Sequence, residues 1–345
     1  MPDALDERLR SMPKVVLHDH LDGSLRPATL FELLHERGMA CPAPDVAALQ
    51  RWFDARAHAG SLVEYLRGFA LTVAAMATPH GLARIAFEAA EDARLDGAVL
   101  AEFRIAPLLF EPFGVPPEAA IEALLEGLAR SALPTGLILC AMRHLDVAES
   151  ERVAALAVRY REIGVVGFDL AGAEFGHPPG EHASALRIAL DGGVALTLHA
   201  GEADAAARVL EAVRLGARRI GHGVRLVDAL APDGDAALFE AVRASGVHLE
   251  VCPTSNVHTG AAASVATHPI TALWRAGISL SFQTDNRLMS QVTHSGEATT
   301  LLRETPLTEA DLRRMGLEAL AHSFLDEDSK ATAREALLAW PLGGA

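Results

Sequence analysis

The sequence predicts an α/β fold, a (β/α)8 TIM-type barrel with a helical insertion after the first strand. Eight short apolar runs alternate with longer amphipathic segments along most of the chain, and they are mostly apolar on both faces. Parallel strands covered by helices have this pattern. An open doubly wound sheet is the rival fold, but no G-x-G-x-x-G follows an early strand. The eight runs are 15–18, 98–105, 136–141, 165–170, 194–199, 219–222, 247–252 and 278–282.

The segments between these runs have the end signals of helices. Thr78 and Pro79 can begin a helix that ends shortly before Gly97. Thr308 and Asp311 have the spacing of a capping box, although Asp is a weaker partner there than Glu or Gln. Helices therefore separate the expected strands, as a (β/α)8 barrel requires.

The first connection, from about residue 21 to residue 97, is unusually long and carries helical patterns. We expect it to be a helical insertion over the mouth of the barrel. A chain of 345 residues suggests two domains at roughly 150 residues each, but α/β barrels commonly exceed that length as one domain. The prediction is therefore one barrel domain over residues 1–345.

The composition excludes several classes of partner. With 30 basic and 45 acidic residues, the formal net charge is −15, whereas proteins that bind nucleic acids or anionic membranes need a cationic surface. The sequence contains neither an apolar run long enough to span a bilayer nor the pattern of a signal peptide. Cys41, Cys140 and Cys252 form no disulfide or metal-binding motif. We expect a cytoplasmic protein that binds neither nucleic acid nor membranes.

Polar residues end several of the predicted strands. In a (β/α)8 barrel the carboxyl ends of the strands meet at the active site, so residues that end different strands there lie close together. Four of the five such residues are histidines and one is an aspartate. They are His18, His20, His199, His222 and Asp285.

The histidine pair at the first strand is a weak signal by itself. His18 and His20 are two residues apart, so both imidazoles can share one face of a strand and bind one metal ion. With 15 histidines in 345 residues, however, the probability that at least one H-x-H pair occurs by chance is roughly one half. His199 can add a third nitrogen ligand, with Glu202 as a nearby carboxylate for proton transfer. Taken singly, each of these residues is more often structural, and only their joint occurrence argues for a site.

These residues lie in segments that resemble the adenosine deaminase family of the amidohydrolase superfamily. The resemblance runs from about residue 13 to residue 325, and its motifs occur in family order. Residues 17–24 read L-H-D-H-L-D-G-S, 169–172 D-L-A-G, 199–202 H-A-G-E, 220–223 I-G-H-G, 250–253 E-V-C-P and 284–285 T-D. Together these motifs are highly specific, whereas the H-x-H pair alone is not.

The resemblance implies a zinc-dependent deaminase of a 6-aminopurine nucleoside. It implies one Zn²⁺ per chain, held by His18, His20, His199 and Asp285. It further implies that zinc-activated water attacks C6 of the purine, that Glu202 protonates ring N1, and that His222 and Asp285 orient the attacking oxygen. Ammonia leaves and a 6-oxopurine remains.

The resemblance also implies substrate contacts, and here the sequence departs from the family pattern. Asp22 would bind a ribose hydroxyl, and the backbone N–H of Gly172 would bind purine N3. Asn286 stands where the family usually has a second aspartate at purine N7, and an amide can still donate to N7. Ala173 replaces another usual aspartate. The departures leave the substrate less defined than the reaction.

Several alternatives stay open at this point. Adenosine or 2′-deoxyadenosine is the default substrate, followed by a 5′-modified adenosine such as 6-aminodeoxyfutalosine, and then free adenine. AMP would need a basic phosphate site, for which the sequence shows no clear cluster. A catalytically inactive purine-binding barrel is the non-enzymatic alternative. A binuclear amidohydrolase would need a carboxylated lysine on a central strand, and the only lysines are Lys14 and Lys330.

Overall fold

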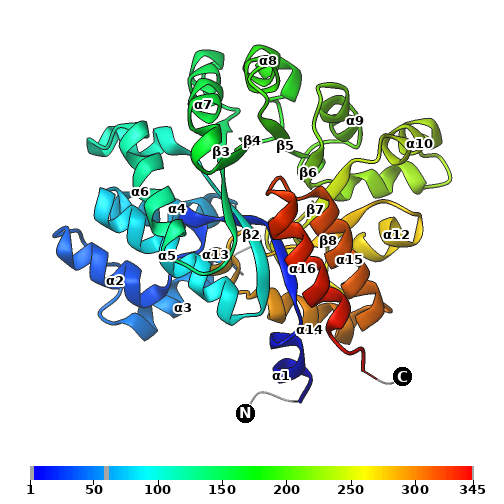
Figure 1. Cartoon of the computed structure of the whole chain (residues 1–345), viewed down its shortest axis with the longest axis horizontal. Helices are drawn as coiled ribbons and strands as arrows, with labels where there is room; N and C mark the ends of the chain where they lie inside the picture. Colours follow the sequence, from blue (N-terminus) through cyan, green and yellow to red (C-terminus); the bar gives the residue numbers. More distant parts are fainter. Residues whose placement is uncertain (1–3, 58–61, 344–345) are drawn as a thin grey trace.

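The computed structural model describes residues 4–57 and 62–343, with residues 62–67 described by their backbone alone. In this part of the chain, eight parallel strands pair in sequence order from β1 to β8. The helices form an outer ring that follows the chain around the strands (Figure 1). The strands are β1 Lys14–His20, β2 Ala98–Ile105, β3 Thr135–Met142, β4 Val165–Ala171, β5 Ala195–Ala200, β6 Arg219–His222, β7 His248–Val251 and β8 Leu280–Phe282.

The α-helices and 3₁₀ helices fill the connections between the strands. The α-helices are α1 Ala4–Arg10, α2 Pro27–Glu36, α3 Val46–Ala57, α4 Leu62–Met76, α5 Pro79–Leu95, α6 Pro117–Ala129, α7 Val147–Tyr160, α8 Ala183–Asp191, α9 Ala207–Arg214, α10 Ala236–Ser245, α11 Pro253–His258, α12 Ile270–Arg275, α13 Arg287–Ser290, α14 His294–Glu304, α15 Glu309–His322 and α16 Glu327–Ala339. The 3₁₀ helices are η1 Leu21–Gly23, η2 Pro107–Phe113, η3 Arg161–Ile163, η4 Pro179–His182 and η5 Val224–Leu230. This alternation confirms the predicted (β/α)8 TIM-type fold.

The first and last strands meet through one side chain and a short stretch of backbone. Gln283 follows β8, and its amide accepts from Leu17 N at 2.9 Å and donates to Val15 O at 3.2 Å, as a peptide group of a neighbouring strand would. Further along, His20 N donates to Asp285 O at 2.8 Å, and Asp285 N donates to His18 O at 3.0 Å. These bonds hold three predicted site residues at one point of the sheet.

All eight predicted strands agree with the structure to within two residues at each end, and the two that are shorter than predicted have local causes. The run 247–252 becomes the shorter β7, because Cys252 is already the N-cap residue of α11. The run 278–282 loses its first residues because Ile278 N bonds back to Leu273 O at the end of α12. Both helix caps are confirmed: Thr78 accepts from Gly81 N, and Thr308 and Asp311 form a capping box.

Helices α2, α3, α4 and α5 occupy the long connection between β1 and β2. Helix α3 packs against α13, and α4 packs against η1, so this segment contacts the loops that follow β8 and β1. Leu33 of α2 and Phe53 of α3 belong to the same buried apolar cluster as Phe103 of β2. That the segment covers the active-site mouth, and that the whole chain is one domain, stay predictions.

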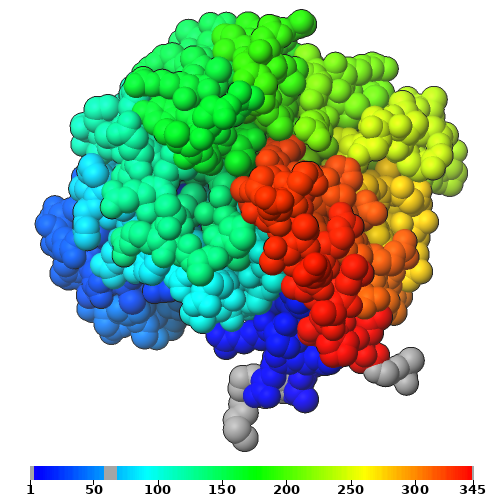
Figure 2. Space-filling model, viewed as in Figure 1, coloured from blue at the N-terminus to red at the C-terminus, as the bar shows by residue number. Residues whose placement is uncertain are grey.

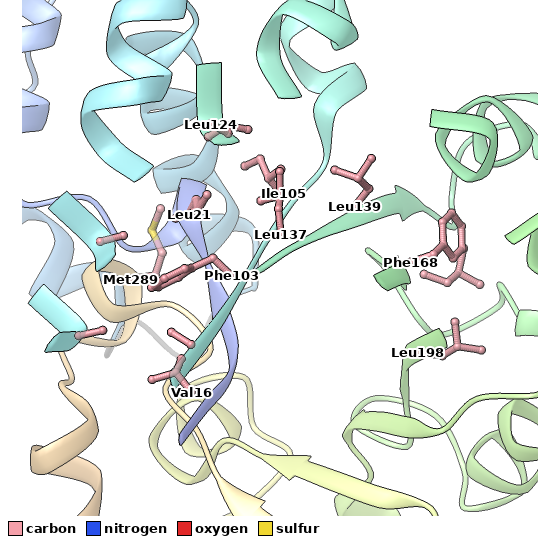
Figure 3. Close-up of a cluster of buried hydrophobic side chains, with 14 of the residues drawn as sticks. Val16, Leu21, Phe103, Ile105, Leu124, Leu137, Leu139, Phe168, Leu198 and Met289 are labelled. Atoms are coloured by element: carbon pink, nitrogen blue, oxygen red, sulfur yellow. The ribbon is translucent and has the colours of Figure 1, made fainter. Parts of the chain in front are cut away.

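The apolar core lies between the strands and the surrounding helices. In Figure 3, Ile105 of β2 and Leu137 of β3 lie near Leu124 of α6, and Phe103 lies beside Met289 of α13. At the edge of the molecule, α1 lies beside the C-terminal segment (Figure 2), where Arg8 pairs with Glu309 at 2.8 Å. Within the described ranges, none of the helices has the length and hydrophobicity that a bilayer span requires.

Candidate active site

The four predicted metal ligands come together at the carboxyl ends of the strands. His18 and His20 lie on β1, His199 lies on β5, and Asp285 follows β8. His18 Nε2 is 3.3 Å and His20 Nε2 is 3.4 Å from Asp285 Oδ1, and His20 Nε2 is 3.3 Å from His199 Nε2. His222, the last residue of β6, also brings a ligand atom within 4.8 Å of those of His18, His199 and Asp285.

The outer nitrogens of two of these imidazoles bond to buried carboxylates. His18 Nδ1 is 2.9 Å from Glu250 Oε2, and His199 Nδ1 is 3.1 Å from Asp169 Oδ1. A carboxylate only accepts hydrogen bonds, so in both rings Nδ1 carries the proton and Nε2 keeps a lone pair. Metal-binding histidines are commonly oriented in this way.

The lone pairs of these rings point toward the same small space. His18 Nε2 is fully buried and has no hydrogen-bond partner among the described residues. It faces the Asp285 carboxylate, which also offers only lone pairs. Such a cluster is electrostatically unfavourable without a cation. Three imidazole nitrogens and one carboxylate oxygen are ligands that Zn²⁺ prefers, so the residues fit a bound zinc ion.

Two buried arginines keep the orienting carboxylates ionised. Arg104 Nη1 donates to Asp169 Oδ2 at 2.8 Å and Nη2 donates to Glu250, while Arg219 Nε donates to Glu250 Oε1 at 2.6 Å. Burial alone would raise the pKa of Asp169, but His199 and Arg104 outweigh it and lower that pKa. For Glu250, Arg104 and Arg219 likewise outweigh burial and lower the pKa well below its usual range. Both carboxylates therefore stay hydrogen-bond acceptors for the imidazoles.

Glu202 and His222 lie side by side next to the predicted metal ligands. Glu202 Oε1 accepts from Asn256 Nδ2 at 3.1 Å and from Thr259 Oγ1 at 2.8 Å. Its other oxygen, Oε2, is 3.5 Å from His222 Nε2. One carboxylate oxygen is thus anchored, while the other faces His222. The sequence analysis missed Asn256 and Thr259, which lie in and directly after α11.

Helix α11 also contacts the fourth predicted metal ligand. Ser255 Oγ donates to Asp285 Oδ2 at 2.6 Å, which leaves Oδ1 facing His18 and His20. Burial would raise the pKa of Asp285, but the neighbouring His18 and His222 lower it well below its usual range. Asp285 is therefore held as a carboxylate with one oxygen directed at the ligand cluster.

Two residues of the site have left-handed backbone conformations. His222 has φ 66° and Asp285 has φ 62°. A non-glycine residue in this region costs on the order of 1–3 kcal/mol, and such strain is often found at functional sites. Glycine at position 221, next to His222, has a steric reason. A Cβ on Gly221 would lie 2.9 Å from His18 Cε1, so the glycine makes room for an imidazole.

The turn that carries Glu202 is held by a single buried carboxylate. Glu174 accepts hydrogen bonds from four consecutive backbone amides, and the distances from Glu202 N, Ala203 N and Asp204 N are 2.9, 2.7 and 3.2 Å. The fourth donor is Gly201 N. Glu174 follows the D-L-A-G motif, yet the sequence analysis gave it no role. Its carboxylate fixes the backbone of the residue predicted to transfer protons.

The predicted substrate-binding residues border the same region. Asp22 lies in η1, is buried, and has its pKa raised to about 7 by burial, with a further contribution from Asp285. Asn286 lies against Gly23, where an added Cβ would be 1.9 Å from Asn286 Oδ1. Gly172 has φ +91°, and a Cβ there would lie 2.9 Å from His144 Nδ1. The need for glycine at position 172 therefore arises from its backbone conformation and from His144.

The two lysines lie where a binuclear metal centre cannot use them. Lys14 Nζ donates to the backbone oxygens of Leu9, Met12 and Asp96 at 2.7, 2.8 and 2.6 Å. Lys330 pairs with Glu327 on α16. Neither lies on β4, the strand where a bridging carboxylated lysine was expected. The composition argument against a binuclear site therefore agrees with the structure.

Comparison with known proteins identifies the family. A sequence model of the family described as adenosine deaminase matches residues 13–340. An adenosine deaminase of Mycobacterium bovis is 41% identical over 340 residues, which covers 94% of this chain and 93% of the relative. The chain belongs to the adenosine deaminase family. It is accordingly a hydrolytic deaminase, and the resemblance found in the sequence is confirmed.

Solved structures of related deaminases share the fold. The adenine deaminase of Arthrobacter aurescens superimposes with a TM-score of 0.87 at 23% identity, covering 95% of this chain and 99% of that one. An amidohydrolase of Burkholderia ambifaria, solved with bound Zn, superimposes with a TM-score of 0.85 at 26% identity. That match covers 99% of this chain and 93% of the other. The barrel is thus the fold of amidohydrolase-type deaminases.

Proposed function

We propose that this member of the adenosine deaminase family is a zinc-dependent deaminase of 6-aminopurine nucleosides. It would convert adenosine or 2′-deoxyadenosine and water into inosine or 2′-deoxyinosine and ammonia. One observation carries the proposal: His18 Nε2 and His20 Nε2 face Asp285 Oδ1, His199 Nε2 lies against His20 Nε2, and Glu202 lies beside the neighbouring His222. The adenosine deaminase of Mycobacterium bovis, at 41% identity, supports the choice of substrate.

The donor set supports zinc as the metal. His18, His20, His199 and Asp285 would hold the ion, and they supply the nitrogen and oxygen ligands typical of catalytic zinc. The Burkholderia ambifaria amidohydrolase, which was solved with bound Zn, is consistent with this choice. When bound, zinc would lower the pKa of a coordinated water toward about 7, so that a nucleophile is present at neutral pH.

The side chains next to the ligands would move and hold protons. Glu202 would take a proton from the attacking water and deliver it to purine N1, because its Oε2 faces the site while Oε1 is anchored. Proton transfer of this kind is typically worth about 10²–10⁴ in rate. His222 and Asp285 would orient the attacking oxygen, and their strained backbones hold both side chains at the ends of β6 and β8.

Three further residues would bind the nucleoside. Asp22 would bind a ribose hydroxyl, and with a pKa raised to about 7 its carboxyl group can accept or donate a hydrogen bond near neutral pH. The backbone N–H of Gly172 would contact purine N3, and the Asn286 amide would donate to N7. A buried carboxyl group suited to a sugar hydroxyl favours a nucleoside over the free base.

A panel of 6-aminopurines tests the proposal. The panel contains adenosine, 2′-deoxyadenosine, 6-aminodeoxyfutalosine, adenine and AMP, and conversion to each 6-oxo product is followed by ultraviolet absorbance. We expect the highest kcat/KM for adenosine or 2′-deoxyadenosine. A clear preference for 6-aminodeoxyfutalosine or adenine would reassign the substrate. No turnover of any compound would favour a purine-binding barrel without activity.

A substitution at position 286 tests how the base is recognised. In Asn286→Asp, a carboxylate replaces the amide that we propose to donate to N7. We expect this change to alter the ratios of kcat/KM within the panel. Unchanged ratios would show that position 286 does not contact the base.

A further inference from the structure

A chain of hydrogen bonds with defined directions leads from a backbone amide to His222. It begins at Ile270 N, which donates to His268 Nδ1 at 3.0 Å. A backbone N–H can only donate, so His268 Nδ1 is the unprotonated, accepting nitrogen of that ring. Because the donor is unambiguous, the direction of the next bond follows from it.

His268 passes this direction on to Asn256. The His268 ring is 4% exposed, and burial, with a smaller effect of His222, lowers its pKa to about 3, so the ring is neutral. Its single proton is therefore on Nε2, which lies 3.3 Å from Asn256 Oδ1 and donates to it. This bond directs the carbonyl of the Asn256 amide toward His268 and its NH₂ group away from it.

The NH₂ group of Asn256 faces two acceptors. Asn256 Nδ2 is 3.1 Å from Glu202 Oε1 and 3.1 Å from His222 Nδ1. A carboxylate cannot donate, so the contact with Glu202 fixes the same amide orientation independently of His268. The amide has two hydrogens, one for each acceptor. His222 Nδ1 therefore accepts, and the proton of the His222 ring lies on Nε2.

We propose that Asn256 is a positioning residue that holds His222 in the Nε2–H tautomer and directs Glu202 toward it. His222 then donates a hydrogen bond to the attacking oxygen and does not bind the metal, because a protonated ring nitrogen has no lone pair for a ligand bond. The tautomer decides whether His222 binds the metal, because by distance alone His222 lies as close to the cluster as a ligand would. The inference rests on the proposed function for its chemistry, but the tautomer can be measured without substrate.

Nuclear magnetic resonance of the zinc-loaded enzyme labelled with ¹⁵N-histidine tests the tautomer directly. The His222 signals are those that disappear in His222→Gln. We expect a protonated Nε2 and an unprotonated Nδ1 in the wild-type protein. In Asn256→Asp the new carboxylate can only accept, so the proton should move to Nδ1. A wild-type ring protonated on Nδ1, or no change of tautomer in Asn256→Asp, would overturn the proposal.

Kinetics provide a second readout on the same variant. The wrong histidine tautomer costs about 10⁴-fold in kcat in a serine protease, so we expect Asn256→Asp to lose at least about 10²-fold. KM should change less than about three-fold, and zinc content should stay at one ion per chain. Loss of zinc, or a kcat within about three-fold of wild type, would contradict the positioning role.

Variants of His268 keep the test decisive if Asn256→Asp fails to fold. His268→Gln keeps an amide N–H that can donate to Asn256 Oδ1, whereas His268→Leu removes the donor. We expect His268→Leu to lose at least about ten-fold more kcat than His268→Gln. His248→Leu, an equally buried histidine at the other end of the barrel, is the matched control and should keep wild-type kcat. Equal kcat in both His268 variants would refute the proposal, whereas a wild-type enzyme inactive on the whole panel would refute only the proposed function.

Discussion

Two clusters of histidines and carboxylates lie at opposite ends of the barrel. The mouth cluster, His18, His199, His222 and Asp285, lies at the carboxyl ends of the strands. The base cluster, His248, Glu318 and His322, lies where β7 begins and α15 ends. In each cluster, atoms able to bind a metal lie within 4.8 Å of one another. Residue types and distances alone therefore do not separate them.

The hydrogen bonds of the ring nitrogens do separate them. In the base cluster, His248 Nδ1 and Nε2 each lie 2.9 Å from a serine hydroxyl, those of Ser279 and Ser281. His322 Nδ1 lies 2.9 Å from Glu318 O, and its Nε2 lies 3.2 Å from Gly246 O. Each ring nitrogen of the base cluster thus lies within hydrogen-bonding distance of a hydroxyl or carbonyl oxygen. In the mouth cluster, His18 Nε2 has no hydrogen-bond partner within the described residues.

This difference is the one we expect between a metal site and a structural cluster. At the mouth, carboxylates take the outer nitrogen of His18 and His199 and leave the inner lone pairs directed at one point. At the base, serine hydroxyls can satisfy both nitrogens of His248, and His322 lies between two backbone carbonyls, to one of which a neutral ring can donate. At the mouth, a metal ion would offset the repulsion between lone pairs that face one another. At the base, a metal ion would break existing hydrogen bonds.

The largest expected effect is on metal binding. We expect one zinc ion per chain in the purified enzyme, and His18→Ala should lose both the ion and all measurable turnover. His322→Ala at the base cluster is the matched control and should keep the ion. Metal analysis by mass spectrometry measures both. Two tightly bound ions per chain, one of them lost in His322→Ala, would show that the base cluster also binds metal.

The next largest effect separates catalysis from metal binding. Glu202→Gln removes the proton-transferring carboxylate but no proposed ligand, so we expect kcat to fall by about 10²–10⁴ while zinc stays bound. Glu318→Gln makes the same chemical change at the base cluster and should leave kcat unchanged. Steady-state kinetics with adenosine, together with metal analysis, measure both. Near-normal turnover of Glu202→Gln would remove Glu202 from its proposed role.

A smaller effect is expected from the groups behind the ligands. Asp169→Asn leaves one neutral acceptor oxygen for two donors, His199 Nδ1 and Arg104 Nη1, and disturbing such a partner typically costs 10–100-fold in metal affinity. Ser279→Ala removes a partner of His248 in the base cluster and should leave zinc affinity unchanged. Competition with a chelator measures both affinities. Equal affinities in wild type and Asp169→Asn would mean that the His199 ring is oriented by other contacts.

The comparison also shows what the sequence could predict. Eight apolar runs were enough for the barrel, and the rule that strand ends meet at one face brought His18, His20, His199, His222 and Asp285 together. Strand ends differed from the prediction where a local hydrogen bond sets the end of the strand. Ile278 is an example, because its amide bonds to the end of α12. The order of apolar residues along the sequence is thus enough to predict the strands and which residues lie at their ends.

The groups that orient the site residues could not be predicted as easily. Asn256 and Glu202 are 54 residues apart, and His18 and Glu250 are 232 apart, so neither pairing follows from local sequence. One signal was present: Glu250 and Arg104 lie within apolar strands, and a buried charge needs a partner. That signal indicates that such residues are paired, but only the structure shows that their partners include His18, a predicted metal ligand.

The smallest expected effect concerns stability at the base cluster. Burial, with a smaller effect of His322, lowers the pKa of His248 well below its usual value. Below about pH 6.5 the unfolded chain takes up a proton there that the folded protein does not, so this residue makes the protein less stable as the pH falls, by up to about 1.4 kcal/mol per pH unit. His248→Gln has no group that titrates at this position, so this pH-dependent loss of stability is absent from the variant. In urea unfolding we therefore expect its stability deficit at pH 7 to shrink by about 1–2 kcal/mol on going to pH 5. A deficit that stays constant or grows over this range would mean that His248 is protonated in the folded protein, and the base cluster would then be a charged site and not a neutral one.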